Sequence, residues 1–131
     1  MTKKKPYTFI DLFAGAGGLS EGFIRAGFTP IAHIEMKQDA CNTLKTRSAF
    51  HYLQNHGQLS IYEEYLKNKE EGTDGSALWA QVPSEVTNAA ICATIGEETI
   101  KGIFEKVDSL KGNKTVDIII GGPPCQAYSV A

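Results

Sequence analysis

The chain has 131 residues, a length that suits one domain with room for a hydrophobic core. Hydrophobic residues make up 42% and charged residues 21%, which argues against a disordered, collagen-like or coiled-coil protein. No apolar run is long enough to span a membrane, so we expect no membrane segment. The net charge of -2 is unusual for a free-standing nucleic-acid binder, so surface outside these residues would have to grip such a partner.

Strand and helix patterns alternate through the first fifty residues. Aromatic and β-branched residues predict a buried strand over 7–13, and helical spacing of apolar residues predicts a helix over 19–27. A second strand follows over 30–35 and a second helix over 39–50. This β-α-β-α pattern predicts a parallel sheet with right-handed crossovers.

The remainder of the chain is less regular. We predict a mostly helical, surface-lying insertion at about 51–84, because the segment is polar and charged. A short third strand is expected within 85–94 and a helix over 97–110. Residues 116–120 (VDIII) read as a fully buried strand that runs directly into the sequence GGPPC.

A glycine-rich loop, FAGAGG, joins the first strand to the first helix. Glycines at such a place let backbone N–H groups approach a ligand beside the positive end of a helix. The oxidoreductase form of this loop needs another glycine where Ser20 stands, which disfavours a nicotinamide enzyme. The alternatives are a nucleotide-like ligand and a tight turn that needs glycine for its backbone alone.

The second strand ends at Glu35, which Met36 follows. An acid at this position accepts hydrogen bonds from a ribose diol in dinucleotide-binding folds, and Met36 offers an apolar surface to an adenine ring. The alternative for Glu35 is a solvated acid at a helix N-terminus. Loop and acid together favour a cofactor of the nucleoside type.

Three widely spaced cysteines, Cys41, Cys92 and Cys125, form no paired motif with the histidines. We therefore expect no disulfide framework, no metal site and a cytoplasmic location. Residues 3–16 have some features of a secretory signal, but Asp11 interrupts their short apolar stretch, so we interpret the lysines as a solvated tail.

Cys125 stands in the loop GGPPCQAYS, where glycines permit close approach and prolines fix the backbone. A cysteine held rigidly after a strand is a candidate nucleophile, whereas the alternative is a buried structural cysteine. We expect that structural role for Cys41 and Cys92, since each lies within a predicted element. In a sheet of order 3-2-1-4, the glycine loop and the Cys125 loop would face one crevice, which suggests group transfer.

These loops resemble those of the cytosine-C5 DNA methyltransferases. FIDLFAGAGGLSEGF at 9–23 is similar to the family's S-adenosylmethionine loop, Glu35-Met36 to its ribose and adenine contacts, and GGPPCQAYS at 121–129 to its catalytic-cysteine loop. The resemblance covers residues 7–50 and about 100–131. It implies part of a Rossmann-like α/β methyltransferase fold, namely the first half of the parallel sheet, and an N-terminal portion of a catalytic domain.

The resemblance also implies roles for individual residues and a mechanism. The Cys125 thiolate would add to C6 of a cytosine flipped out of double-stranded DNA, and C5 would then take the methyl group of S-adenosylmethionine. DNA methylation of the restriction-modification type is the implied function. The residues that would hold the cofactor are Phe13, Ala14, Gly15, Gly17, Gly18, Leu19, Glu35, Met36, Gly122 and Pro124.

Two family features are absent from the expected places. The segment AAICATIG at 89–96 carries no acid for the adenine amino group, although Glu97 or Glu98 follows it. No Glu-Asn motif follows Cys125, so we expect this chain to be inactive alone and to need a C-terminal half in cis or in trans. The alternatives are a tRNA cytosine-C5 methyltransferase of the same family and a non-catalytic S-adenosylmethionine-binding module.

Overall fold

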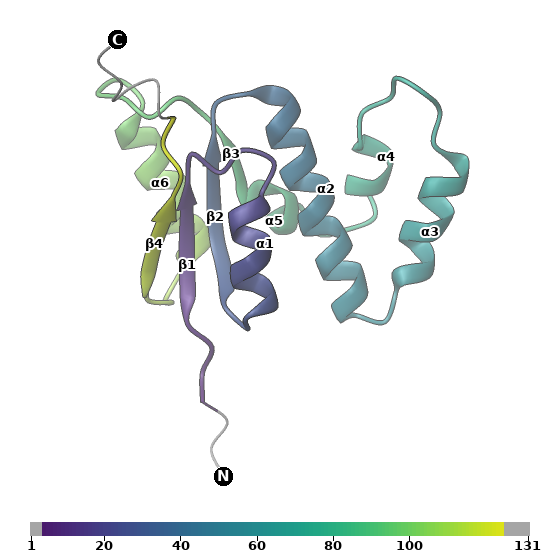
Figure 1. The fold of residues 1–131 in the computed structure, drawn as a ribbon, viewed down its shortest axis with the longest axis horizontal. Coiled ribbons are helices and arrows are strands. Elements are labelled where there is room, and N and C mark those ends of the chain that lie inside the picture. Colours follow the sequence, from purple (N-terminus) through teal and green to yellow (C-terminus); the bar gives the residue numbers. More distant parts are fainter. Residues whose placement is uncertain (1–3, 125–131) are drawn as a thin grey trace.

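A computed structural model describes residues 4–124 of the chain, and its centre is a four-stranded parallel sheet of order β3-β2-β1-β4 (Figure 1). The strands are β1 (Thr8–Leu12), β2 (Thr29–Glu35), β3 (Ala90–Cys92) and β4 (Ile118–Gly121). The helices are α1 (Gly18–Arg25), α2 (Gln38–Asn55), α3 (Leu59–Asn68), α4 (Ser76–Trp79), α5 (Ser84–Asn88) and α6 (Ile100–Lys111). The α/β class and the strand order predicted from the sequence are confirmed.

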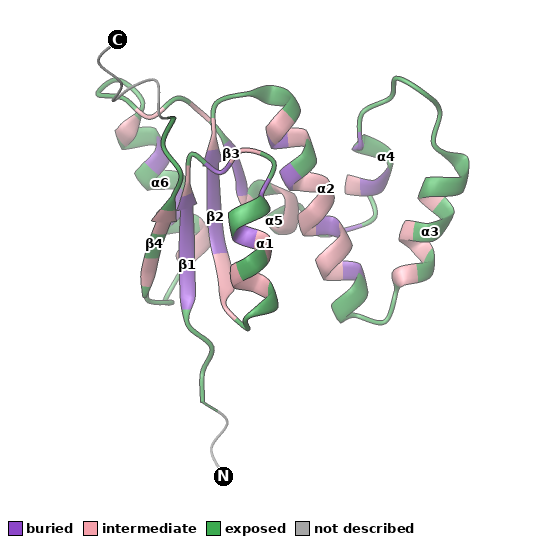
Figure 2. Cartoon of the chain, in the orientation of Figure 1, coloured by how far each residue is buried: buried purple, intermediate pink, exposed green. Residues whose placement is uncertain are grey.

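Helices cover both faces of the sheet, as alternation of side chains along the strands requires. On one face, Phe9 of β1 packs against Phe23 of α1, with ring centroids 5.5 Å apart. On the other face, Ile10 and Ile34 join Ile103 of α6 in a buried cluster. The central strands β1 and β2 are the most buried part of the molecule (Figure 2).

The segment 51–84 contains the end of α2 together with α3 and α4, which lie beyond α2 from the sheet (Figure 1). It has a small core of its own, because Leu53 and Leu78 are fully buried and Tyr62 and Tyr65 of α3 pack against them. Helix α2 packs against both the sheet and this small core. It runs to Asn55 and thus ends five residues past its predicted end. That this segment is an insertion remains a prediction.

The prediction of a fully buried strand at 116–120 is wrong. Strand β4 alternates half-buried and exposed residues, and Ile119 is 63% exposed. The reason is its place at the edge of the sheet, where no described helix covers Ile119. A run of apolar residues indicates a fully buried strand only where other elements cover both faces of the sheet at that strand.

The expectation for the two remaining cysteines is only half correct. Cys41 is fully buried on α2, as predicted, but Cys92 is exposed. Strand β3 is only three residues long, and its buried residues are Ala90 and Ile91. Cys92 is the last residue of the strand and lies at the carboxyl edge of the sheet.

Within residues 4–124, no helix is both long and apolar enough to cross a membrane. The same residues contain no group of three or more His, Cys, Asp or Glu side chains placed to hold a metal ion.

Candidate functional site

The loops that follow β1 and β4 leave the sheet side by side. Leu12 and Gly121 are paired in the parallel register, and both are the last residues of their strands. A Cβ atom on Gly121 would lie 2.7 Å from the Leu12 carbonyl oxygen, so only glycine permits this approach. The two loops singled out from the sequence therefore start at one edge of the sheet, the edge at which parallel α/β proteins bind ligands.

The glycine loop has an unusual backbone that explains its composition. Phe13, Gly15 and Gly17 all have positive φ, at 56°, 58° and 91°. The loop is tied down at Ala14, whose amide donates to the carbonyl of Ile34 at 3.0 Å. A positive φ at Phe13 is a strained conformation for a residue with a side chain, and such strain clusters at functional sites.

The two sides of the glycine loop differ in how much space they leave. A Cβ atom on Gly17 would lie 2.9 Å from a methyl carbon of Leu44 on α2, so the inner side is packed. By contrast, a Cβ atom on Gly15, Gly18 or Gly122 would meet no other atom within 4 Å, so the outer sides of these glycines are open. The loop thus presents bare backbone to open space beside the N-terminus of α1, a kind of surface at which charged or polar ligands bind in other proteins.

Glu35 closes one end of this space. Its Oε2 atom accepts the Gly15 amide at 2.6 Å, and its Oε1 atom accepts the amides of Met36 at 2.9 Å and Lys37 at 3.0 Å. Partial burial opposes ionisation, but these three N–H donors outweigh it and hold the pKa of Glu35 below its ordinary value. Oε2 has room for a further donor, such as a ligand hydroxyl.

Apolar side chains stand open around the same edge. Phe13, Leu19 and Met36 are 40%, 47% and 60% exposed. Large apolar groups exposed together at a polar rim are typical of ligand sites. Gly122 and Pro124 follow β4 and are exposed, whereas Cys125 lies outside the described residues.

A chain of buried polar side chains that was not predicted from the sequence lies beneath the glycine loop. The Ser20 hydroxyl donates to the Asp11 carboxylate at 2.5 Å and lies 2.9 Å from Nδ1 of His33. All three side chains are at least 96% buried. Burial raises the pKa of Asp11, and burial together with the charge of His51 lowers the pKa of His33 to about 4. The sequence did contain a signal for this chain, because Asp11 and His33 are polar residues within otherwise apolar strands.

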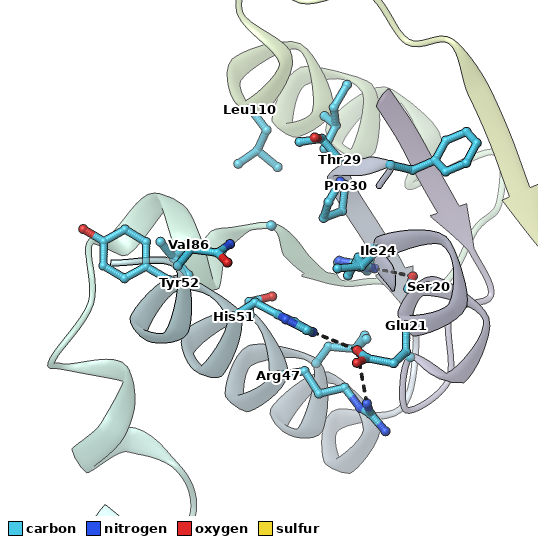
Figure 3. Close-up of a pocket in the computed structure, with 18 of the residues that line it drawn as sticks. Ser20, Glu21, Ile24, Thr29, Pro30, Arg47, His51, Tyr52, Val86 and Leu110 are labelled. Carbon is cyan, nitrogen blue, oxygen red and sulfur yellow. Dashed lines mark hydrogen bonds and ion pairs between the residues drawn. The ribbon is translucent and has the colours of Figure 1, made fainter. Parts of the chain in front are cut away.

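A large cavity lies elsewhere in the described part of the chain. It has a volume of about 970 Å³ and lies between α1, α2 and the amino-terminal half of β2 (Figure 3). At its polar end, Glu21 of α1 accepts a hydrogen bond from Nε2 of His51 at 2.8 Å and pairs with Arg47 at 3.6 Å (Figure 3). Of the candidate cofactor residues, Gly17 alone lines it. We therefore place the candidate site at the open carboxyl edge of the sheet.

Comparison with known proteins decides the family. The model of the family described as C-5 cytosine-specific DNA methylase matches residues 7–73, just over half of the chain. The chain belongs to this family of cytosine-specific DNA methylases. The matched stretch contains the glycine loop and Glu35, and it ends before the loop of Cys125.

Several curated proteins resemble this methylase-family chain over most of its length. Type II methyltransferase M.Bpa9945I of Bacillus paralicheniformis is 36% identical, over 92% of this chain and 31% of its own length. The putative type II methyltransferase M.MjaORF1200P of Methanocaldococcus jannaschii is 31% identical, over 94% of this chain and 36% of its own. The chain thus spans about a third of the length of these relatives. No solved structure matches it significantly.

Proposed function

We propose that this chain is the cofactor-binding and nucleophile-bearing part of a DNA (cytosine-5-)-methyltransferase. The observation that carries the proposal is the pairing of Leu12 with Gly121, which starts the glycine loop and the Cys125 loop at one edge of the sheet. A cofactor on the first loop and a nucleophile on the second would then act on one substrate. Membership of the methylase family supports the same activity.

The residues at this edge fit S-adenosylmethionine. Open space at Gly15 and Gly18 admits the polar part of the ligand, and the free acceptor position of Glu35 suits a ribose hydroxyl. Met36 offers an apolar surface for the adenine ring. When bound, S-adenosylmethionine supplies an electrophilic methyl group. The proposed binding residues are Phe13, Ala14, Gly15, Gly17, Gly18, Leu19, Glu35, Met36, Gly122 and Pro124.

The chemistry that we assign to the protein is nucleophilic. C5 of cytosine is a weak nucleophile, and addition of the Cys125 thiolate to C6 makes C5 enamine-like. Later loss of the C5 proton and of the thiolate would restore the aromatic ring. Because C6 cannot be reached inside a duplex, the base has to be flipped out.

Recognition of DNA is assigned to another part of the enzyme. The net charge of -2 offers little attraction to phosphates, and the relatives are about three times as long as this chain. We propose that a C-terminal half, in cis or in trans, supplies the DNA-gripping surface and the remaining catalytic groups. The 131-residue chain alone is then inactive.

Transfer of a labelled methyl group from S-adenosylmethionine tests the proposal. The chain is assayed alone and with its C-terminal half, on double-stranded DNA and on tRNA. We expect no transfer by the chain alone and label on DNA cytosine with both parts. Label on tRNA would show that the substrate is RNA and would contradict the assignment of DNA. Cofactor binding without transfer to either substrate would indicate a non-catalytic module.

A further inference from the structure

Two thiols meet where β2, β3 and α2 come together at the carboxyl edge of the sheet. Cys92 is the register partner of Glu35 in the parallel pair of β2 and β3. The Cys41 thiol, on α2, donates to the carbonyl oxygen of that same Glu35 at 3.2 Å. The Cys92 thiol lies 3.8 Å from the next carbonyl oxygen, that of Met36. The two sulfur atoms, one from α2 and one from β3, are therefore held by the carbonyl groups of two consecutive residues, Glu35 and Met36.

The environments of the two thiols differ in a way that suits a pair. Cys92 is exposed, and its thiol lies 3.5 Å from Oε1 of Gln38 and 3.8 Å from the carbonyl oxygen of Met36. Cys41 is fully buried, and burial followed by the neighbouring Cys92 raises the pKa of its thiol to about 12. A peroxide can reach Cys92, whereas Cys41 is shielded from solvent and keeps its proton until a partner comes close.

We propose that Cys41 and Cys92 are a redox pair that closes to a disulfide at the rim of the candidate cofactor site. The position beside the cofactor rests on the proposed function, but the pairing of the two thiols does not.

The reaction balances with a peroxide as the oxidant. The Cys92 thiol gives up its proton and the thiolate attacks hydrogen peroxide, so that an S–O bond forms and the O–O bond breaks. The hydroxide that leaves takes up that proton and becomes water. The Cys41 sulfur then attacks the Cys92 sulfenic acid, loses its proton, and displaces the oxygen as a second water. Two thiols are oxidised and one peroxide is reduced to two waters. Glu35 keeps a donor to its carbonyl after Cys41 turns away, because the Ala93 amide donates to it at 2.9 Å.

Peptide mapping tests the pair directly. The third cysteine is removed by Cys125→Ser, and the reduced chain is treated with hydrogen peroxide, blocked and digested with trypsin. Cys41 lies in the tryptic peptide 38–45 and Cys92 in the peptide 70–101. We expect these two peptides to be joined, with a mass two hydrogens below their sum. The unsubstituted chain gives the same map if Cys125→Ser proves unstable, because Cys125 lies in a third peptide.

One variant serves as the matched control, and two outcomes would contradict the proposal. Cys41→Ser in the same background leaves Cys92 without its partner, and we expect a sulfenic acid there instead of a cross-link. Oxidation of Cys92 to a sulfinic acid while Cys41 stays reduced would overturn the proposal. A cross-link of Cys92 to a second chain would also overturn it.

S-adenosylmethionine added before the peroxide separates the two proposals. If the cofactor covers Met36, it shields the adjacent Cys92, and the disulfide forms several-fold more slowly. Unchanged formation would keep the redox pair and contradict the cofactor position. Cofactor binding by a chain that forms no disulfide even without the cofactor would support the cofactor site and contradict the redox pair.

Discussion

The Gly15 amide donates a hydrogen bond of 2.6 Å to the Glu35 carboxylate, which joins the glycine loop to the end of β2. The residues are 20 apart in sequence, and the bond brings backbone and acid to one side of the candidate site. The carboxylate of Glu35 thus shapes the loop, and in the proposed function it also accepts a hydrogen bond from the ligand. Substitutions here and beneath the loop test how the site is built.

Glu35→Gln should weaken binding of S-adenosylmethionine about 10- to 100-fold, the worth of one hydrogen bond to a charged group. The amide has one acceptor oxygen where the carboxylate has two, so it cannot accept both from Gly15 and a ligand on one side and from the amides of Met36 and Lys37 on the other. Isothermal titration calorimetry measures the change. Glu105→Gln, on the exposed surface of α6, is the matched control and should bind as the unsubstituted chain does. Equal affinity in the two variants would remove Glu35 from the site.

Glycine substitutions in the loop should separate packing from binding. Both Gly15→Ala and Gly17→Ala place a side chain at positive φ, which costs about 1 kcal/mol. Only Gly17→Ala also meets Leu44 at 2.9 Å, so its total loss of stability should reach about 2–4 kcal/mol. Gly15→Ala should instead act on cofactor binding, because its Cβ enters open space. Urea unfolding and calorimetry together check the contrast, and a larger stability loss at Gly15 would refute it.

Ser20→Ala should lower the free energy of unfolding by about 1–3 kcal/mol. The substitution leaves a buried carboxylate oxygen of Asp11 and a buried ring nitrogen of His33 without the hydroxyl between them. The other oxygen of Asp11 already has no partner in the described part of the chain, so no spare bond compensates. Ser109→Ala on exposed α6 is the control for urea unfolding. A loss no greater than that of the control would show that the chain of hydrogen bonds is not stabilising.

The buried imidazole of His33 should make stability depend on pH. Burial, with the charge of His51, lowers its pKa from 6.5 to about 4 in the folded protein. Its contribution is complete above the unfolded pKa and falls as pH drops from 6.5 towards 4, by up to about 3 kcal/mol, because the unfolded state takes the proton first. Burial raises the pKa of Asp11, which adds a pH dependence of its own. Asp11 is present in the unsubstituted chain and in a His33 variant alike, so a comparison of the two isolates the contribution of His33.

His33→Asn should therefore flatten the pH dependence of the free energy of unfolding between about pH 6.5 and pH 4. Urea unfolding of both proteins at several pH values measures the slope. His56→Asn, an exposed position that leaves the Asp11–Ser20–His33 chain intact, is the control. Parallel curves for His33→Asn and the unsubstituted chain would contradict the account.

The sequence predicted those parts of the fold that depend on local patterns. Apolar runs and the glycines after residue 13 were enough for β1, α1 and β2, and the alternation of strands and helices in a doubly wound pattern predicted the order of the sheet. Burial of β4 and Cys92 was mispredicted because exposure at a sheet edge depends on neighbours that a run of residues does not reveal. The link from Ser20 to His33 joins residues 13 apart, and only the packing of α1 on β2 brings them together.

Covalent trapping on DNA that contains 5-fluorocytosine tests the central claim most directly. Fluorine replaces the C5 proton and cannot be removed by a base, so elimination is blocked and the thiolate remains bonded to C6. With its C-terminal half and S-adenosylmethionine, the chain should form an adduct that maps to Cys125, and Cys125→Ser should abolish the adduct while cofactor binding persists. An undiminished adduct in Cys125→Ser would contradict the account, as would a mapped attachment to any other residue.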